Sequence, residues 1–372
     1  MKINKKIVRV QIKSLIFLII FCLQFTLGFN SSIITAYADE NEKVEFNKLF
    51  ITEDEYEKTM KEVVQVYLDE KREDGYLKID ENTKLYYQKY SVENPKATIV
   101  ISHGFSESLE KYREIIYYFL KSGYSVYGIE HRGHGRSGSL GVIDKSQVNI
   151  TDFNYYVSDF KKFIDDIVKP NIGQEKMLLY AHSMGGAIGA KFLEKYPEYF
   201  DAAILNAPML EIDTGNTPEF LAESISWIYT TFSFGDKYVA TQKPYNLEYN
   251  LEKSCTSSDV RYKYYYDIVS SNNDLQRGGA SYNWLRNSIK ATKEITKQEN
   301  ASKIEIPVLL FQAEKDTYVK PRGQNMFAQY AKNCKVILSV GSKHETYREK
   351  DSVLKPYLNN VFDFYNKNLK TE

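Results

Sequence analysis

The chain has 372 residues, of which 43% are hydrophobic and 26% are charged. Its 49 basic and 49 acidic residues give a formal net charge of zero, which argues against a nucleic-acid partner, because nucleic-acid-binding proteins carry a basic excess. Three cysteines are too few for a disulfide scaffold, and 19 glycines and 9 prolines exclude collagen-like or low-complexity structure. The length and composition predict a globular protein with one large domain or two ordinary ones.

Residues 1–38 have the pattern of a secretory signal peptide. Five basic residues and no acidic residue precede an apolar run over 15–29, and Ala36 and Ala38 are the small residues expected before a cleavage site. The run is shorter than the roughly 20 residues of a membrane span. Cleavage after Ala38 would leave 44 basic and 49 acidic residues, a net charge of −5. We therefore expect a secreted or cell-surface protein, with an uncleaved N-terminal anchor as the alternative.

The elements that follow indicate an α/β fold. A helix over 51–70 comes first, with Thr52 and Glu55 spaced as in a capping box, and a β-hairpin over 75–90 follows, where apolar and polar residues alternate. From residue 97 strands and helices alternate, which predicts a mostly parallel sheet with helices on both faces. The predicted strands are 97–102, 125–130, 177–181, 201–208, 307–313 and 335–340, and the predicted helices are 108–123, 150–169 (ending at Pro170), 185–196, 323–331 and 354–368.

The segment 209–302 interrupts this alternation, because it is rich in tyrosine, helical in pattern and without buried strand runs. We interpret it as a helical cap inserted between strands of a core that comprises 39–208 and 303–372. An insertion at the carboxyl edge of a parallel sheet covers the edge where ligands bind. The alternative is that these helices are ordinary covering helices.

The strongest local signal is AHSMGG at 181–186, between a predicted strand and a predicted helix. A serine on a sharp strand-to-helix turn projects its hydroxyl free of the sheet, and small residues two before and two after it relieve crowding. Ala181 and Gly185 occupy those positions, although the first is more often glycine. We therefore expect Ser183 to be a nucleophile. The alternative is a glycine-rich helix start that packs tightly on the sheet.

A serine nucleophile needs a general base and an acid that orients this base. Among the five histidines, His344 is the only one after the serine, as the chain order serine–acid–histidine requires. Asp316, in the loop after the 307–313 strand, is the preferred acid, and Glu314 is the reserve. His182 is expected to point away from the serine. The other histidines lie in loops, where a structural role is open to them: His103, His131 and His134.

The oxyanion that forms during acyl transfer needs N–H donors. The backbone N–H of Met184 follows the nucleophile at a helix N-terminus, where the helix dipole also favours negative charge. The second donor is expected to be the backbone N–H of Phe105, because Gly104 before it allows a close approach. Glu107 and Lys111, four residues apart, either brace this loop or form an ordinary surface pair.

Other ligand sites have little support in the sequence. The spacing G-x-G-x-x-G occurs at 133–138, but the next predicted helix begins too late for a dinucleotide-binding turn. The histidines lack metal-ligand spacing and the cysteines are isolated, so we expect no metal and no cofactor. Cys255 and Cys334 are expected to be unpaired thiols.

Four segments in this order, HGFSESLEKYREIIYYFLKSGYSVYGIEHRGHGRSG, AHSMGGAI, LLFQAEKDTYV and SKHETYREKD, resemble the α/β-hydrolase superfamily. More narrowly, they resemble its lysophospholipase and monoacylglycerol lipase branch, which is often grouped with serine aminopeptidases. The segments PYNLEYNLEKS and GGASYNWLRNSI are similar to bacterial lysophospholipases. This resemblance implies an α/β-hydrolase fold, a triad of Ser183, Asp316 and His344, and oxyanion donors at Phe105 and Met184.

The expected function is hydrolysis of carboxylic esters of single-chain lipids, a lysophospholipid or a monoacylglycerol, with transient contact with a membrane surface left open. The alternatives are an aminopeptidase or amidase, a short-chain carboxylesterase, and a non-catalytic binding module. An aminopeptidase would need acidic cap residues to bind an ammonium group, and Glu211, Asp213, Glu219 and Glu223 are available. The apolar cap residues Ile225, Trp227, Ile228, Tyr229 and Phe232 either line an acyl tunnel or seal the cap to the core.

Overall fold

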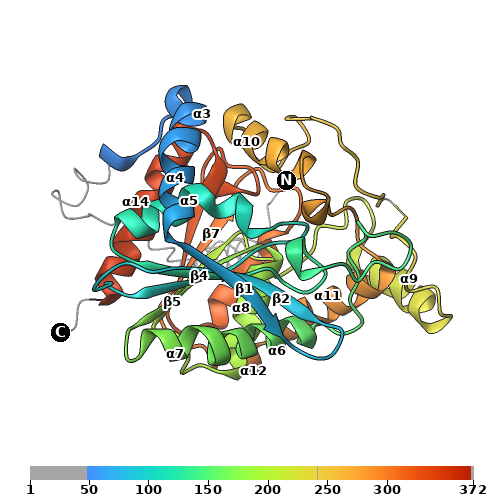
Figure 1. The fold of residues 1–372 in the computed structure, drawn as a ribbon. Coiled ribbons are helices and arrows are strands. Elements are labelled where there is room, and N and C mark those ends of the chain that lie inside the picture. The colour runs from blue at the N-terminus through green and yellow to red at the C-terminus, as the bar shows by residue number, and fades with distance from the viewer. Residues whose placement is uncertain (1–47, 241, 370–372) are drawn as a thin grey trace, which may run out of the picture. The chain divides into compact units, whose positions relative to one another are not determined.

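A computed structural model describes residues 48–240 and 242–369, which are built around an eight-stranded sheet (Figure 1). The strand order is β1-β2-β4-β3-β5-β6-β7-β8. Strands β3 to β8 pair in parallel, whereas the β1–β2 hairpin is antiparallel and joins β4 antiparallel. The prediction of an α/β fold with a mostly parallel sheet is confirmed. The strands are β1 Arg72–Lys78, β2 Lys84–Tyr90, β3 Thr98–Ser102, β4 Ser125–Ile129, β5 Met177–His182, β6 Ala202–Asn206, β7 Val308–Ala313 and β8 Cys334–Ser339.

Helices cover both faces of this sheet, and each face has its own apolar core. In β3, Val100 points into one core and Ile99 and Ile101 into the other, because successive side chains of a strand alternate between faces. The first core contains α6 (Asn154–Phe163), α8 (Met184–Lys195), α11 (Tyr282–Ile295) and α13 (Pro321–Tyr330). The second contains the N-terminal helix, formed by η1 (Glu53–Glu55), α3 (Tyr56–Thr59), η2 (Met60–Val64) and α4 (Gln65–Lys71), together with α5 (Arg113–Lys121) and α14 (Asp351–Leu369).

Two helix predictions are wrong in detail. The side chain of Thr52 makes no capping hydrogen bond; its carbonyl oxygen accepts the N–H of Glu55 instead, so the capping box does not form. The helix expected to end at Pro170 continues to Ile172. A π-helical turn, η5 (Ile164–Val168), precedes this proline, which then occupies the first turn of α7 (Lys169–Ile172). A missing N–H costs little there.

The segment between β6 and β7 folds into helices in two kinds of environment. α11 and α12 (Gln298–Ala301) contribute buried side chains to the same core as α8. α9 (Glu219–Thr231) has only Ala222 and Ser226 buried. α10 (Asp259–Ser270) is held to the core by the fully buried Arg261. The predicted cap and its boundaries at 209 and 302 stay a prediction.

Arg261 explains why α10 is firmly attached. Its Nε lies 3.0 Å from a carboxylate oxygen of Glu114 on α5, and its Nη1 lies 2.9 Å from Asp351 on α14. It also donates to the carbonyl oxygen of Ile51, before the N-terminal helix, at 2.9 Å. One guanidinium therefore joins α10 to α5, to α14 and to the segment before the N-terminal helix.

The described helices include none with the length and apolar character required to cross a bilayer. The predicted signal peptide, residues 1–38, lies outside the described residues. Cys255 and Cys334 are free thiols, as expected.

Candidate active site

Ser183 occupies the sharp turn between β5 and α8. Its backbone has φ 52° and ψ −118°, which residues other than glycine rarely adopt. The turn is crowded, because a Cβ on Gly185 would lie 2.2 Å from the carbonyl oxygen of Ser102 and 2.4 Å from that of His103. Glycine two residues after the serine is therefore a steric requirement of this turn.

The structure brings Ser183, His344 and Asp316 together at the carboxyl edge of the sheet. Nε2 of His344 lies 2.8 Å from Oγ of Ser183, and Nδ1 of His344 lies 2.7 Å from Oδ2 of Asp316. The serine follows β5, the aspartate follows β7 and the histidine follows β8. Because parallel strands end at one edge, residues 161 positions apart form a single hydrogen-bonded chain.

Asp316, and not Glu314, is the acid that the structure places beside the histidine. Its side chain is 6% exposed, and its Oδ1 accepts the N–H groups of Tyr318 at 2.8 Å and Val319 at 3.1 Å. Burial alone would raise the pKa of Asp316, but the hydrogen bond and charge of His344, together with these N–H groups, hold it below its usual value. Glu314 is exposed and accepts the N–H of Gly341 at 2.7 Å.

Phe105, whose backbone N–H is the second predicted oxyanion donor, lies in the loop after β3. The N–H of Gly104 donates to Oε2 of Glu107 at 2.6 Å, and Nδ1 of His103 lies 2.8 Å from the carbonyl oxygen of Gly104. These bonds orient the peptides on either side of Gly104, so that Phe105 follows at a defined position, with its ring 4.5 Å from that of Trp284. Met184, in the first turn of α8, has no intrahelical acceptor for its N–H, as a donor to an oxyanion requires.

The three other histidines are buried and structural. Nε2 of His103 accepts the N–H of His131 at 2.9 Å, and Nε2 of His131 lies 3.0 Å from Oγ of Ser102. Burial lowers the pKa of His103 and of His131, and it lowers that of His134 to about 3. These rings are therefore neutral near pH 7 and hold the loops around the site.

Glu107 and Lys111 form a buried brace and not a surface pair, since their side chains are only 3% and 9% exposed. Glu345, directly after the candidate base, bonds to the same lysine at 2.7 Å, and Arg348 bonds to Glu345 at 2.6 Å. Sequence reasoning missed Glu345 and Arg348. The available signal was two opposite charges three residues apart, immediately after His344.

The acidic residues considered for an ammonium site are paired with cations. Glu211 accepts two hydrogen bonds from Arg322, each 2.8 Å long, and Arg322 also reaches Glu219 at 3.0 Å. Lys293 pairs with both Glu219 and Glu223, and Lys320 lies 3.7 Å from Asp213. These pairs compete with the binding of a substrate ammonium group.

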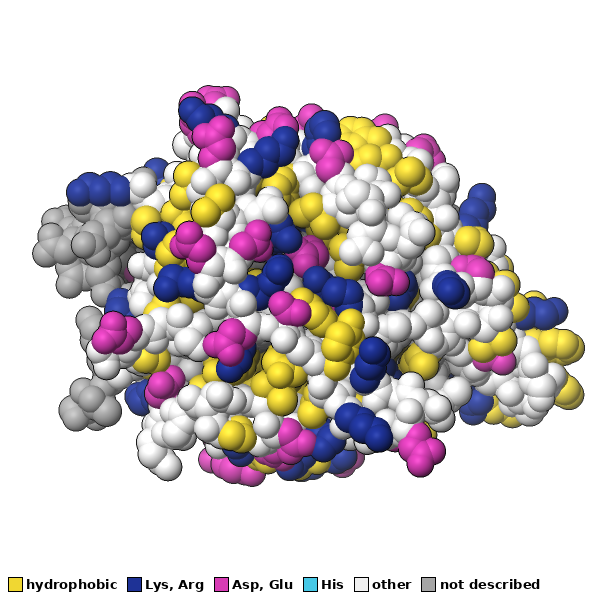
Figure 2. All heavy atoms as spheres, in the orientation of Figure 1, with side chains coloured by type: hydrophobic (Ala, Val, Ile, Leu, Met, Phe, Trp, Pro, Cys, Tyr) yellow, Lys and Arg dark blue, Asp and Glu magenta, His cyan; other side chains and the backbone are white. Residues whose placement is uncertain are grey.

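The apolar side chains considered for an acyl tunnel lie mostly at the surface. Ile225, Trp227, Ile228 and Phe232 are 40–65% exposed, and Tyr229 stacks on Tyr282 with ring centroids 4.0 Å apart. Hydrophobic side chains are visible in the space-filling view around the projecting end of α9 (Figures 1 and 2). These four side chains are therefore largely open to solvent in this structure, and the choice between an acyl tunnel and a cap-to-core seal stays open.

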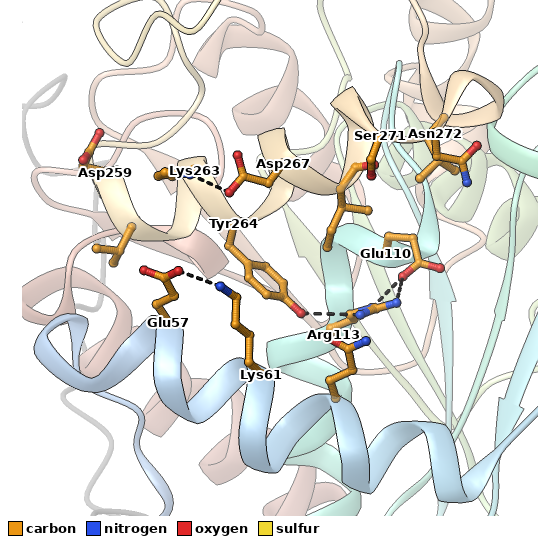
Figure 3. Close-up of a pocket in the computed structure, with 14 residues that line it drawn as sticks. Glu57, Lys61, Glu110, Arg113, Asp259, Lys263, Tyr264, Asp267, Ser271 and Asn272 are labelled. Atoms are coloured by element: carbon orange, nitrogen blue, oxygen red, sulfur yellow. Dashed lines mark hydrogen bonds and ion pairs between the residues drawn. The ribbon is translucent and has the colours of Figure 1, made fainter.

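A separate cavity of about 400 Å³ lies between the N-terminal helix and α10, and no member of the candidate triad lines it (Figure 3). Its cations are already paired: Lys61 with Glu57, Lys263 with Asp267, and Arg113 with Glu110. In the part of the chain that the structure describes, no three or more His, Cys, Asp or Glu side chains form a group that could hold a metal ion.

Comparison with known proteins identifies relatives of this chain. The family model described as serine aminopeptidase, S33, matches residues 93–351. Lysophospholipase L2 of Escherichia coli (strain K12) is 33% identical over 245 residues, 65% of this chain and 70% of that protein. Monoglyceride lipase of Homo sapiens is 28% identical over 261 residues, 68% of this chain and 77% of that protein. A monoglyceride lipase structure from Saccharomyces cerevisiae has the same fold, with a TM-score of 0.64, 19% identity, and coverage of 81% and 97% of the two chains.

Proposed function

Because the chain belongs to the serine aminopeptidase S33 family, we propose that it is a serine hydrolase that cleaves carboxylic esters of single-chain lipids, a lysophospholipid or a monoacylglycerol. The observation that carries the chemistry is the hydrogen-bonded chain from Ser183 through His344 to Asp316. The names of the relatives, lysophospholipase and monoglyceride lipase, support the substrate class.

The geometry accounts for each step of ester cleavage. Nε2 of His344 accepts the proton of the Ser183 hydroxyl as Oγ attacks the ester carbonyl, and Asp316 stabilises the imidazolium that forms. The N–H groups of Met184 and Phe105 stabilise the tetrahedral oxyanion. The imidazolium then protonates the departing alcohol, which leaves an acyl-enzyme on Ser183. Water activated by His344 releases the fatty acid and restores the serine.

Cleavage of an aminoacyl amide is the second candidate, because the family description names aminopeptidases. It would require an acidic site for the free amine, and the candidate acids are paired with Arg322, Lys293 and Lys320. A short-chain ester would use the same triad without an acyl site.

The test is hydrolysis by the purified protein and by its Ser183→Ala variant. The panel comprises palmitoyl-lysophosphatidylcholine, monopalmitoylglycerol, a short p-nitrophenyl ester and an alanine arylamide. We expect the two long-chain lipids to be hydrolysed best and the variant to lose activity on every substrate. Turnover of the arylamide alone would overturn the lipid assignment, and full activity of Ser183→Ala would overturn the mechanism.

We also propose that α9 contacts the lipid surface from which the substrate is drawn. Phe220 and Phe232, near its two ends, are 63% and 65% exposed, and burial of such side chains in lipid is favourable by about 1.5–3 kcal/mol each. A net charge of −5 after leader removal means that this contact would be apolar and would not depend on anionic lipid.

Vesicle sedimentation tests this contact. Phe220→Ser with Phe232→Ser should reduce binding to phosphatidylcholine vesicles, whereas Val142→Ser with Ile143→Ser, at another exposed apolar site, should not. Equal loss in both double variants would contradict a specific role of α9.

Export is a further part of the proposal, supported by the pattern of residues 1–38. N-terminal sequencing of the protein isolated from culture medium or from the cell surface should begin at Asp39. A protein that retains residues 1–38 and fractionates with membranes would instead support the uncleaved anchor.

A further inference from the structure

We infer that the buried cluster of Glu107, Lys111 and Glu345 is a positioning site that holds three loops at fixed relative positions. These are the oxyanion loop, which follows β3 and carries Phe105, the nucleophile turn at Ser183, and the histidine loop, which follows β8 and carries His344. The inference rests on the proposed function, because the relative position of these three loops affects catalysis only if they act on one substrate. None of the three side chains is assigned a contact with the substrate, so each acts through the loop that it holds.

Lys111 joins two loops directly. Its Nζ lies 3.0 Å from Oε1 of Glu107, in the loop after β3, and 2.7 Å from Oε1 of Glu345, in the loop after β8. Arg348 supplies the second positive charge, 2.6 Å from Glu345. Two carboxylates therefore face two cations, with all four side chains 3–9% exposed.

The cluster stays charged at neutral pH. Burial opposes the ionisation of Glu345, but the charges of Lys111 and Arg348 outweigh it and lower the pKa of Glu345 to about 2. The same balance, with Lys111 and His182 as the neighbouring groups, holds the pKa of Glu107 well below its usual value. The ion pairs therefore persist over the pH range in which the enzyme would work.

Glu107 controls the peptide immediately before the proposed oxyanion donor. Its Oε2 accepts the N–H of Gly104 at 2.6 Å and the hydroxyl of Tyr112 at 2.6 Å. The fit leaves no room for a side chain, because a Cβ on Gly104 would lie 2.9 Å from Nδ1 of His182 and 3.0 Å from the Glu107 carboxyl group. A change at this carboxylate would therefore be transmitted to the N–H of Phe105.

His182 connects the cluster to the nucleophile and to the base. Its Nδ1 lies 3.2 Å from Oε1 of Glu107, and its Nε2 lies 3.3 Å from the backbone carbonyl oxygen of His344. The residue that follows it is Ser183. The same carboxylate group thus touches the oxyanion loop and, through one imidazole, the two residues that exchange the proton.

A purely stabilising role explains this arrangement less well. Taking several charges out of water costs free energy, and replacing buried ion pairs by apolar residues is often neutral for stability or favourable. Ion pairs with directional hydrogen bonds, however, set distances and angles at the loops they join. Misplacement of a catalytic group by about 1 Å can cost roughly 100-fold in rate.

The decisive variant is Glu107→Gln, which removes the charge and keeps the shape. The matched control is Asp159→Asn, in the buried pair of Arg132 and Asp159, where the acid is 2% exposed and lies on α6. We expect Glu107→Gln to lower kcat by about 100-fold with KM changed less than threefold. At a comparable loss of Tm, Asp159→Asn should keep kcat within threefold of the parent.

The outcomes separate this inference from the proposed function. If the parent protein hydrolyses no ester and is not labelled by a fluorophosphonate, the proposed function fails. If the parent is active and Glu107→Gln affects kcat no more than Asp159→Asn does, the cluster only stabilises the fold and the inference is overturned. If Glu107→Gln does not fold, Glu345→Gln, measured in the same way, decides between these results.

Discussion

Replacing Asp316 by asparagine gives a sharp test of the site, because the structure predicts how the new amide group would be oriented. Oδ1 of Asp316 accepts two backbone N–H groups, from Tyr318 and Val319, and only an oxygen atom can replace it there. The amide nitrogen of the asparagine would then face Nδ1 of His344, 2.7 Å from the present carboxylate oxygen. Facing a donor, Nδ1 must lose its proton, so that Nε2 carries the proton and cannot accept another from Ser183.

The expected magnitude follows from this loss of the base. The wrong histidine tautomer in a serine triad lowers kcat by roughly 10⁴-fold. This factor corresponds to about 5.5 kcal/mol of transition-state stabilisation, since each factor of ten is about 1.36 kcal/mol. The assay is steady-state hydrolysis of monopalmitoylglycerol and a p-nitrophenyl ester, together with the rate of fluorophosphonate labelling, which should fall in parallel.

Glu314→Gln is the matched control, because it makes the same chemical change two residues away on an exposed side chain that only accepts the N–H of Gly341. It should change kcat less than threefold. Retention of more than a tenth of the activity by Asp316→Asn would refute the orientation argument, and so would an equal loss in Glu314→Gln.

Three further predictions concern packing and charge. In Gly185→Ala the new Cβ would clash with the carbonyl oxygens of Ser102 and His103. The variant should therefore have a lower kcat and a free energy of unfolding lower by about 1–3 kcal/mol, measured by urea titration. A variant with unchanged stability and kcat would contradict the crowding at this turn. Arg261→Met should lower the free energy of unfolding by about 3–5 kcal/mol because it leaves the buried Glu114 carboxylate without its cation, whereas Lys263→Met, in an exposed pair on the same helix, should cost far less; equal losses would refute the distinction. Burial raises the pKa of Glu194 to about 8 in the folded protein. Between pH 4.5 and about 8, this carboxyl group loses its proton in the unfolded chain but keeps it in the folded protein, so the parent should lose stability as pH rises over this range. Glu194→Gln should remove this contribution, which thermal unfolding of the parent and the variant at pH 5 and pH 8 would measure.

Local sequence patterns determined much of the fold. The alternation of short β-branched runs with helical periodicity predicted the mostly parallel sheet, because both patterns follow from local geometry and burial. The small residues of the turn at 181–186 predicted the position of Ser183, because the crowding that requires them lies at the turn itself. Chain order alone selected His344 from five histidines, and the structure places it 2.8 Å from Ser183.

Other features depended on contacts between residues far apart in the chain. The sequence favoured Asp316 but kept Glu314 as an alternative, and only the direction of the loop after β7 decides which of them lies beside His344. Glu107 and Lys111 had two interpretations until burial decided between them. The exposure of α9 is likewise a property of what packs against it. The sequence alone therefore determined the order of the elements and the chemistry available. Only the tertiary structure decided which charges are buried together, because burial and pairing depend on neighbours that local patterns do not specify.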